Sequence, residues 1–205
     1  MNLDEAMRTQ RALRKLKPDP IPDEVLLELV DLAIRAPSGS NAQGWEFILV
    51  RDPERKAAIG RLNRPAVKFY LGLGRLFKKP DEKAQRLMAA VEWQAEHFAE
   101  LPVILVPCLR GRPPLFPFIG TTSYFGSIYP AVQNYMLAAR SREIGTTLIT
   151  LPLWNVGKLK RILGLPRNVT PCCLVPTGYP YGSFGPTTRR PAEEVAHFDK
   201  WGGKP

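Results

Sequence analysis

The sequence predicts a mixed α/β protein, built as one domain of 205 residues. Three short apolar runs have the length and composition of buried strands: 45–52, 101–109 and 171–180. Longer segments between them carry apolar residues at helical spacing. A chain in which long helices alternate with apolar strands favours helices packed in layers on a sheet.

The N-terminal half begins with a predicted helix over residues 3–15, which ends before the prolines of KPDPIP. A second helix follows in PDEVLLELVDLAIRA (22–36), with acidic residues in its first turn and apolar residues at helical spacing. The turn PSGSNAQGWEF (37–47) then leads into the first strand. A short helix is predicted over residues 53–60.

The rest of the chain continues the alternation. Charged, mostly helical sequence fills residues 65–99, ahead of the second strand. The third strand is followed by a tail rich in Gly and Pro. The remaining expected elements are an irregular loop (111–126), a helix stopped by Gly145 (127–145), a strand or loop (146–153), a helix (154–166) and the tail (181–205).

The composition is ordinary for a water-soluble protein, with 44% hydrophobic and 23% charged residues. No apolar run approaches the ~20 residues that a membrane helix needs, and no stretch resembles a signal peptide. We therefore expect a cytoplasmic protein without membrane contact. Cys172 and Cys173 are adjacent, so in a strand they would face opposite sides, and Cys108 stands apart. Neither a metal site nor a redox C-x-x-C motif is expected.

A formal net charge of +10 raises nucleic-acid binding as one alternative function. The basic residues are scattered, however, and no aromatic residues are interleaved with them to stack on bases. Surface charge without a nucleic-acid partner is the favoured interpretation.

Several catalytic signatures are absent from the sequence. Its two histidines, His97 and His197, have no neighbours that suggest a Ser-His-Asp triad. Neither a G-x-G-x-x-G motif after a strand nor a G-x-x-x-x-G-K-[ST] motif is present. A redox cofactor would have to be held by another arrangement.

Four segments in order resemble the nitroreductase family of FMN-dependent oxidoreductases over nearly the whole chain. They are RALRKLKPDPIPDE (11–24), PSGSNAQGWEF (37–47), EIGTTLI (143–149) with LKRILGLP (159–166), and LVPTGYP (174–180) with TTRRP (187–191). The resemblance implies a homodimer with a nitroreductase-like α/β (α+β) fold, in which helices flank a central, mainly antiparallel sheet. A variable helical or lid insertion is expected at about 65–126.

The resemblance also implies a phosphate site for FMN near the N-terminus. The family's R-S-x-R-type motif matches Arg11, Ala12, Leu13 and Arg14, with Ala12 where a hydroxyl is common. Two guanidinium groups one helical turn apart would converge on one phosphate. Arg189, or its neighbour Arg190, resembles the late basic residue that closes this site. A solvated, basic helix end is the alternative interpretation of the motif.

The resemblance further implies that the turn at 37–43 contacts the isoalloxazine ring and ribityl chain of FMN. Small residues permit close backbone approach, and amide and hydroxyl groups suit the ring's polar edge. Trp45 is expected to pack in the core. The matching residues are Pro37, Ser38, Gly39, Ser40, Asn41 and Gln43.

By the same resemblance, the backbone of the third segment would donate a hydrogen bond to the ring nitrogen that accepts hydride. We place this contact at Thr150 or Leu151. No catalytic side chain is required, because the cofactor carries the chemistry. The implied reaction transfers hydride from NADH or NADPH through FMN to a nitroaromatic or quinone. A flavin storage protein, its ring covered by the PPLFPF loop with Phe116 and Phe118, is a further alternative.

Overall fold

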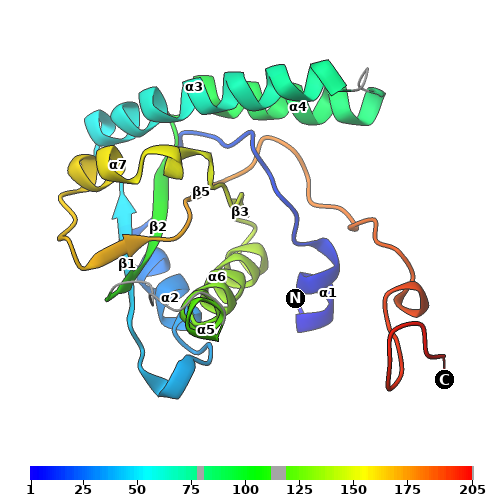
Figure 1. Cartoon of the computed structure of the whole chain (residues 1–205). Coiled ribbons are helices and arrows are strands. Elements are labelled where there is room, and N and C mark those ends of the chain that lie inside the picture. The colour runs from blue at the N-terminus through cyan, green and yellow to red at the C-terminus, as the bar shows by residue number, and fades with distance from the viewer. Residues whose placement is uncertain (78–80, 112–118, 205) are drawn as a thin grey trace.

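A five-stranded antiparallel sheet forms the centre of the protein (Figure 1). The computed structural model describes residues 1–77, 81–111 and 119–204. The strands follow the order β1-β2-β5-β3, and β4 pairs with β2 beside this path. They are β1 (Trp45–Val50), β2 (Val103–Arg110), β3 (Gly145–Thr146), β4 (Val169–Pro171) and β5 (Val175–Gly178). The predicted central, mainly antiparallel sheet is confirmed.

Strand β2 is buried on both faces. Its side chains alternate between two apolar clusters, with Val103 and Leu105 in one and Ile104 and Val106 in the other. This burial explains why the segment is apolar without alternation. Strand β1 pairs with it in antiparallel register from Trp45 opposite Leu109 to Val50 opposite Ile104.

Helices cover both faces of the sheet (Figure 1). One core cluster joins the sheet to α2 and α6, and the other joins it to the start of α3 and to α7. Partly buried Trp45 packs against the first cluster, as expected. The helices are α1 (Leu3–Thr9), α2 (Asp23–Ala33), α3 (Pro53–Phe77), α4 (Glu82–Glu96), α5 (Ile119–Gly126), α6 (Tyr129–Ser141) and α7 (Val156–Leu163), with short 3₁₀ turns η1 (Gly39–Asn41), η2 (Leu151–Asn155) and η3 (Ala192–Glu194). None of the helices in these described ranges is long and apolar enough to span a membrane.

Helices α3 and α4 form a long pair that lies across one face of the molecule (Figure 1). The separate helices predicted over 53–60 and within 65–99 are thus partly wrong, because α3 runs on through Pro65. Part of the predicted loop 111–126 is also helical, since α5 occupies its end. The PPLFPF segment lies in 112–118, outside the described residues.

The predicted helix over 3–15 is wrong beyond Thr9. Gln10 is extended, and the following backbone joins the edge of the sheet. Leu13 N–H donates to Thr146 O at 3.1 Å, and Lys17 N–H donates to Tyr179 O at 2.7 Å. Backbone groups need hydrogen-bond partners when they are buried, and here the sheet supplies them in place of a helix.

Two features of the C-terminal half differ from the sequence-based expectation, the end of α6 and the strand expected over 171–180. Helix α6 ends at Ser141, and Glu143, not Gly145, adopts the left-handed conformation with φ 56°. The strand expected over 171–180 is two strands separated by the cysteine pair. Cys172 and Cys173 therefore lie outside a strand, and both join the core on the α2 and α6 side.

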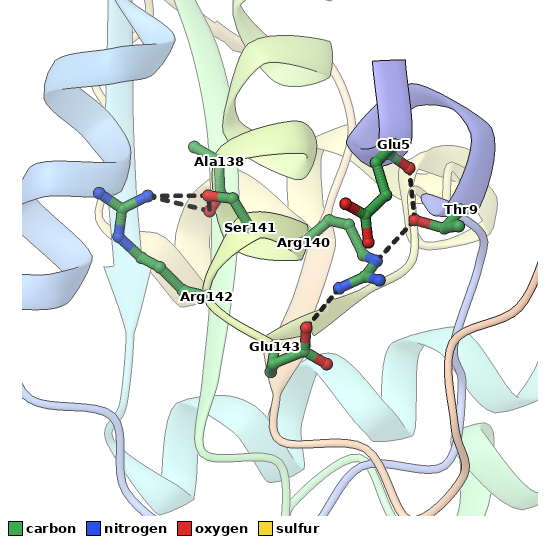
Figure 2. Close-up of polar contacts among 7 residues, drawn as sticks. All are labelled: Glu5, Thr9, Ala138, Arg140, Ser141, Arg142 and Glu143. Carbon is green, nitrogen blue, oxygen red and sulfur yellow. Dashed lines mark hydrogen bonds and ion pairs between the residues drawn. The ribbon is translucent and has the colours of Figure 1, made fainter. Parts of the chain in front are cut away.

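A buried arginine of α6, Arg140, holds both ends of the chain against this helix. Figure 2 shows its contacts to Thr9 and Glu143. The Arg140 side chain donates to Thr9 Oγ1 at 2.9 Å and pairs with Glu143 at 2.6 Å. Its guanidinium carbon lies 4.0 Å from the centre of the Phe184 ring, which belongs to the C-terminal segment. The Thr9 hydroxyl in turn donates to Glu5 O at 2.6 Å, so the end of α1 is fixed against α6.

We expect Arg140→Met to lower the free energy of unfolding by roughly 1.5–3 kcal/mol, because it removes hydrogen bonds from a buried charge. Arg86→Met is the control, since the Arg86–Glu82 pair is exposed and its loss costs less than about 1 kcal/mol. Urea denaturation of both variants measures the difference. Equal, small losses would contradict a stabilising role for Arg140.

Candidate functional site

A pocket of 580 Å³ lies between α3, α4 and the segment that enters η2. Leu148, Ile149, Thr150 and Leu151 form one wall, and Arg14 reaches it from the extended N-terminal segment. The structure therefore brings together three of the residues predicted for a flavin site: Arg14, Thr150 and Leu151. Helices α3 and α4 supply the remaining walls.

The helical walls of the pocket are mainly apolar. They include Val67 and Leu71 from α3, and Met88 and Val91 from α4. Within the described lining, Arg14 is the sole charged side chain and no Asp or Glu is present. The pocket thus suits a planar apolar or aromatic molecule that carries negative charge at one side.

Arg14 is a partly desolvated cation. Burial lowers the pKa of its guanidinium from the ordinary value, while Tyr70 acts in the opposite direction. An arginine nevertheless stays protonated at any physiological pH. No carboxylate in the described part of the chain forms an ion pair with it. An anionic group in the pocket would provide the missing partner.

The other residues of the N-terminal motif lie differently from the prediction. Ala12 forms an isolated parallel β-bridge with Thr146, and Thr147 Oγ1 donates a hydrogen bond to Leu13 O at 2.7 Å. In an extended chain, side chains three residues apart point to opposite faces. Arg11 and Arg14 are therefore not one helical turn apart, and the geometry expected from a helix is wrong. Their roles in binding stay predictions.

Arg11 lies beside the C-terminal segment that carries Arg189 and Arg190. A side-chain carbon added at Gly185 would lie 3.8 Å from Arg11 Nη1. The neighbouring Thr187 donates to Arg8 O from both its N–H and its hydroxyl, at 2.9 and 3.0 Å. Arg189 and Arg190 follow this contact on an exposed stretch, where Arg189 donates to Thr188 O.

The turn at 37–43 is held in an uncommon conformation. Ser40, Asn41 and Gln43 all have positive φ, at 52°, 53° and 48°. Such angles are uncommon outside glycine and mark a backbone that its surroundings hold in place. Gly39 N–H donates to Ser127 Oγ at 3.0 Å, and Gln43 N–H donates to Ser38 Oγ at 3.0 Å. Pro37 and the tip of the turn are exposed.

Within one chain, this turn lies on the opposite side of the sheet region from α3 and α4 (Figure 1), the two helices that line the pocket. It precedes β1, whereas α3 begins just after β1 ends. Six residues of strand span about 20 Å, so the two features sit at opposite ends of the sheet. The structure does not bring Pro37, Ser38, Gly39, Ser40, Asn41 and Gln43 together with Arg14.

The buried thiols are unsuited to nucleophilic chemistry. Burial raises the pKa of Cys108 and of Cys172 to about 12, and it raises that of Cys173 as well. Thiolate is the reactive form, so all three are inert near neutral pH. Among the described residues, no group of His, Cys, Asp and Glu is arranged to hold a metal ion.

Sequence reasoning missed two buried amides in the pocket, Asn63 and Gln94. Asn63 precedes Val67 and Leu71 at intervals of four residues, and Gln94 continues the apolar stripe of Val91 on α4. A polar residue within an apolar helical stripe is a signal that could have identified each of them.

The antiparallel α/β fold, with an apolar pocket and an unpaired cation, is compatible with a protein that binds a planar anionic cofactor. The model of the Nitroreductase family matches residues 7–179, and the chain belongs to this family. The solved structures that share its fold include one described as a BluB-like flavoprotein and one bound to FMN.

Relatives of different named activities resemble the chain. An iodotyrosine deiodinase of Nematostella vectensis is 25% identical over 93% of this chain and 72% of its own length. A rat iodotyrosine deiodinase is matched over only 61% of its length. An NADH dehydrogenase of Thermus thermophilus is 27% identical over 91% of this chain and 90% of its own.

A solved structure extends the comparison to a bound cofactor. An oxidised iodotyrosine deiodinase bound to FMN and 3-iodo-L-tyrosine aligns with a TM-score of 0.71 and 24% identity. The alignment covers 97% of this chain and 99% of the other. At this level of identity, the likeness establishes the fold.

We expect the two arginines to act on different parts of FMN. Arg14→Ala should weaken FMN and riboflavin alike, because Arg14 faces the pocket that would hold the ring. Arg11→Ala should weaken FMN by roughly ten- to a hundredfold and leave riboflavin unaffected, because only FMN carries the phosphate. Flavin fluorescence titrations measure both ligands.

Arg167→Ala is the control for general loss of positive charge, since Arg167 is exposed on the loop after α7. If Arg11→Ala weakened the binding of FMN and of riboflavin equally, Arg11 would not bind the phosphate. If Arg14→Ala weakened the binding of FMN but not that of riboflavin, Arg14 would instead bind the phosphate.

Proposed function

We propose that the protein is an FMN-dependent oxidoreductase that passes electrons from NADH or NADPH to a small aromatic acceptor such as a nitroaromatic or quinone. The observation that carries the proposal is the pocket in which Arg14, Thr150 and Leu151 meet an apolar wall. Membership of the Nitroreductase family and the flavin-bound relative support it.

The residues present fit an FMN ring. A pocket of 580 Å³ is within the range typical of small-molecule sites. Its walls are apolar, as the faces of an aromatic ring require, and Arg14 provides a cation that has no carboxylate partner in the described residues. Leu151 begins η2, and the first N–H groups of a helix lack acceptors within that helix.

FMN, when bound, supplies the two-electron transfer chemistry. The residues of the chain would bind the FMN ring, orient it and tune its electrostatic environment. Arg14 places positive charge in a partly desolvated wall, where it favours negative charge on a ligand. Thr150 or Leu151 would donate a backbone N–H to the ring edge. Val67, Leu71 and Met88 would exclude water above the ring.

The charge of the pocket bears on the acceptor. The names of the relatives suggest deiodination of an iodotyrosine as a second candidate reaction. A free amino acid brings an ammonium group, whose burial without a carboxylate partner costs several kcal/mol. The described lining contains neither Asp nor Glu. This supports an acceptor without an ammonium group.

The separation of the turn from the pocket supports a homodimer. If both features contact one FMN, they must come from different subunits, because one strand length of about 20 Å lies between them within a chain. A symmetric dimer would then form two such sites. The exposed C-terminal tail, with Trp201 89% exposed, would wrap the neighbouring subunit.

Purified protein should release FMN on denaturation and should oxidise NADH or NADPH faster when nitrobenzene or 1,4-benzoquinone is added. The acceptor 3-iodo-L-tyrosine should give a rate at least roughly tenfold lower, because its ammonium group lacks a partner in the pocket. Stopped-flow absorbance of the flavin follows both half-reactions. A flavin-loaded protein that no nicotinamide reduces would favour flavin storage, and preference for iodotyrosine would favour deiodination.

Two inactive variants should complement each other if the site is shared between subunits. Arg14→Glu removes the pocket cation. Asn41→Asp places a carboxylate near the ring carbonyls, and Asp, like Asn, tolerates the positive φ at this position. After co-expression with two tags, about one quarter of the sites should regain tight FMN binding, because half of the dimers are mixed and each has one intact site. No recovery in purified mixed dimers would contradict the shared site.

A further inference from the structure

Two buried amide groups in the pocket lack hydrogen-bond partners. Asn63 is 3% exposed and Gln94 is 4% exposed. Within the described residues, Asn63 Oδ1 and Gln94 Nε2 have no partner. A buried polar group that is left unsatisfied costs about 1–3 kcal/mol, so most are paired in native proteins. Both side chains line the pocket, and rotation of either amide would turn its unsatisfied atom toward a ligand there.

The two amides lie at the same end of the pocket. Arg64, next to Asn63, donates to Glu96 O, two residues beyond Gln94. Gly60 permits this close approach, because a side-chain carbon added there would lie 2.9 Å from Phe98 Cβ. The opposite end of the pocket, near Leu73, is ten residues or about 15 Å further along α3.

The helical walls of the pocket therefore have a polar end and an apolar end, and Arg14 reaches the pocket close to Tyr70, further along α3. Val67 and Leu71 from α3 face Met88 and Val91 from α4 along the rest of its length. The isoalloxazine ring has the same division, with an imide edge (an N–H between two carbonyls) at one end and a dimethylbenzene ring at the other. The pairing of an unsatisfied acceptor with an unsatisfied donor matches that edge.

We propose that Asn63 and Gln94 bind the imide edge of FMN, with Asn63 accepting from the ring N3–H and Gln94 donating to an adjacent carbonyl. This inference rests on the proposed function. The terminal torsions of Asn and Gln are broad, so either amide turns toward a ligand at little cost.

The test compares FMN with N3-methyl-FMN, in which the ring donor is replaced by a methyl group. Wild-type protein should bind FMN roughly tenfold tighter than the methylated form, and Asn63→Leu should remove this preference. Gln94→Met should weaken both flavins by roughly three- to tenfold, because the carbonyls are unchanged. Met88→Leu, in the same pocket but without a hydrogen bond, is the control and should preserve the preference.

Thermal unfolding of the flavin-free protein separates ligand binding from a structural role. Asn63→Leu and Gln94→Met should leave the Tm unchanged or raise it by about 2–4 °C, because they remove unsatisfied polar groups. Weaker binding together with equal or greater stability is the result expected. If the variants lost stability and their affinity for both flavins fell in proportion to that loss, the amides would serve the fold, and the proposal would be overturned.

Binding to wild-type protein distinguishes the two levels of inference. If FMN binds and N3-methyl-FMN binds equally well, the amide assignment is wrong while the proposed function stands. If neither flavin binds, the proposed function fails and this inference fails with it.

Discussion

The burial of strand β2 on both faces is the constraint on which the rest of the structure depends. Val103 and Leu105 need one apolar layer, and Ile104 and Val106 need another. The chain must therefore place helices on both sides of the sheet and cross from one side to the other. Strand β1 makes one such crossing, which sets the turn at 37–43 at one end of the sheet and the start of α3 at the other.

The local sequence was sufficient to predict the parts of the fold with strong patterns. The apolar segments around β1 and β2 are strands, and the periodic segment before Ala33 is a helix. The extended conformation after Thr9 was not predictable in this way, because partners more than 130 residues away decide it. Leu13 pairs with Thr146, and no local propensity encodes that contact.

The candidate site likewise contains residues that were predicted from the sequence and residues that were not. Arg14, Thr150 and Leu151 were identified from the order of motifs, and they share one pocket. Asn63 and Gln94 interrupt apolar helical stripes, a pattern that marks each as a candidate but names no ligand. The packing of α3 against α4 adds that each amide keeps one buried atom without a hydrogen-bond partner in the described part of the chain.

Several features of the ligand-free chain are individually unfavourable. A partly desolvated cation, two amides with an unsatisfied atom each, and the three residues with positive φ in the turn at 37–43 all cost free energy. The apolar clusters on either side of the sheet offset these costs. A ligand that satisfies the polar groups stabilises the folded state by mass action, so stability and occupancy are linked.

The burial of the thiols has a consequence for chemical durability. Oxidants attack thiolates, and the surrounding core keeps Cys108, Cys172 and Cys173 protonated and covered. The core thus shields its sulfur atoms by limiting both ionisation and access. While the core stays closed, oxidation of these three thiols to sulfenic acids or mixed disulfides is disfavoured.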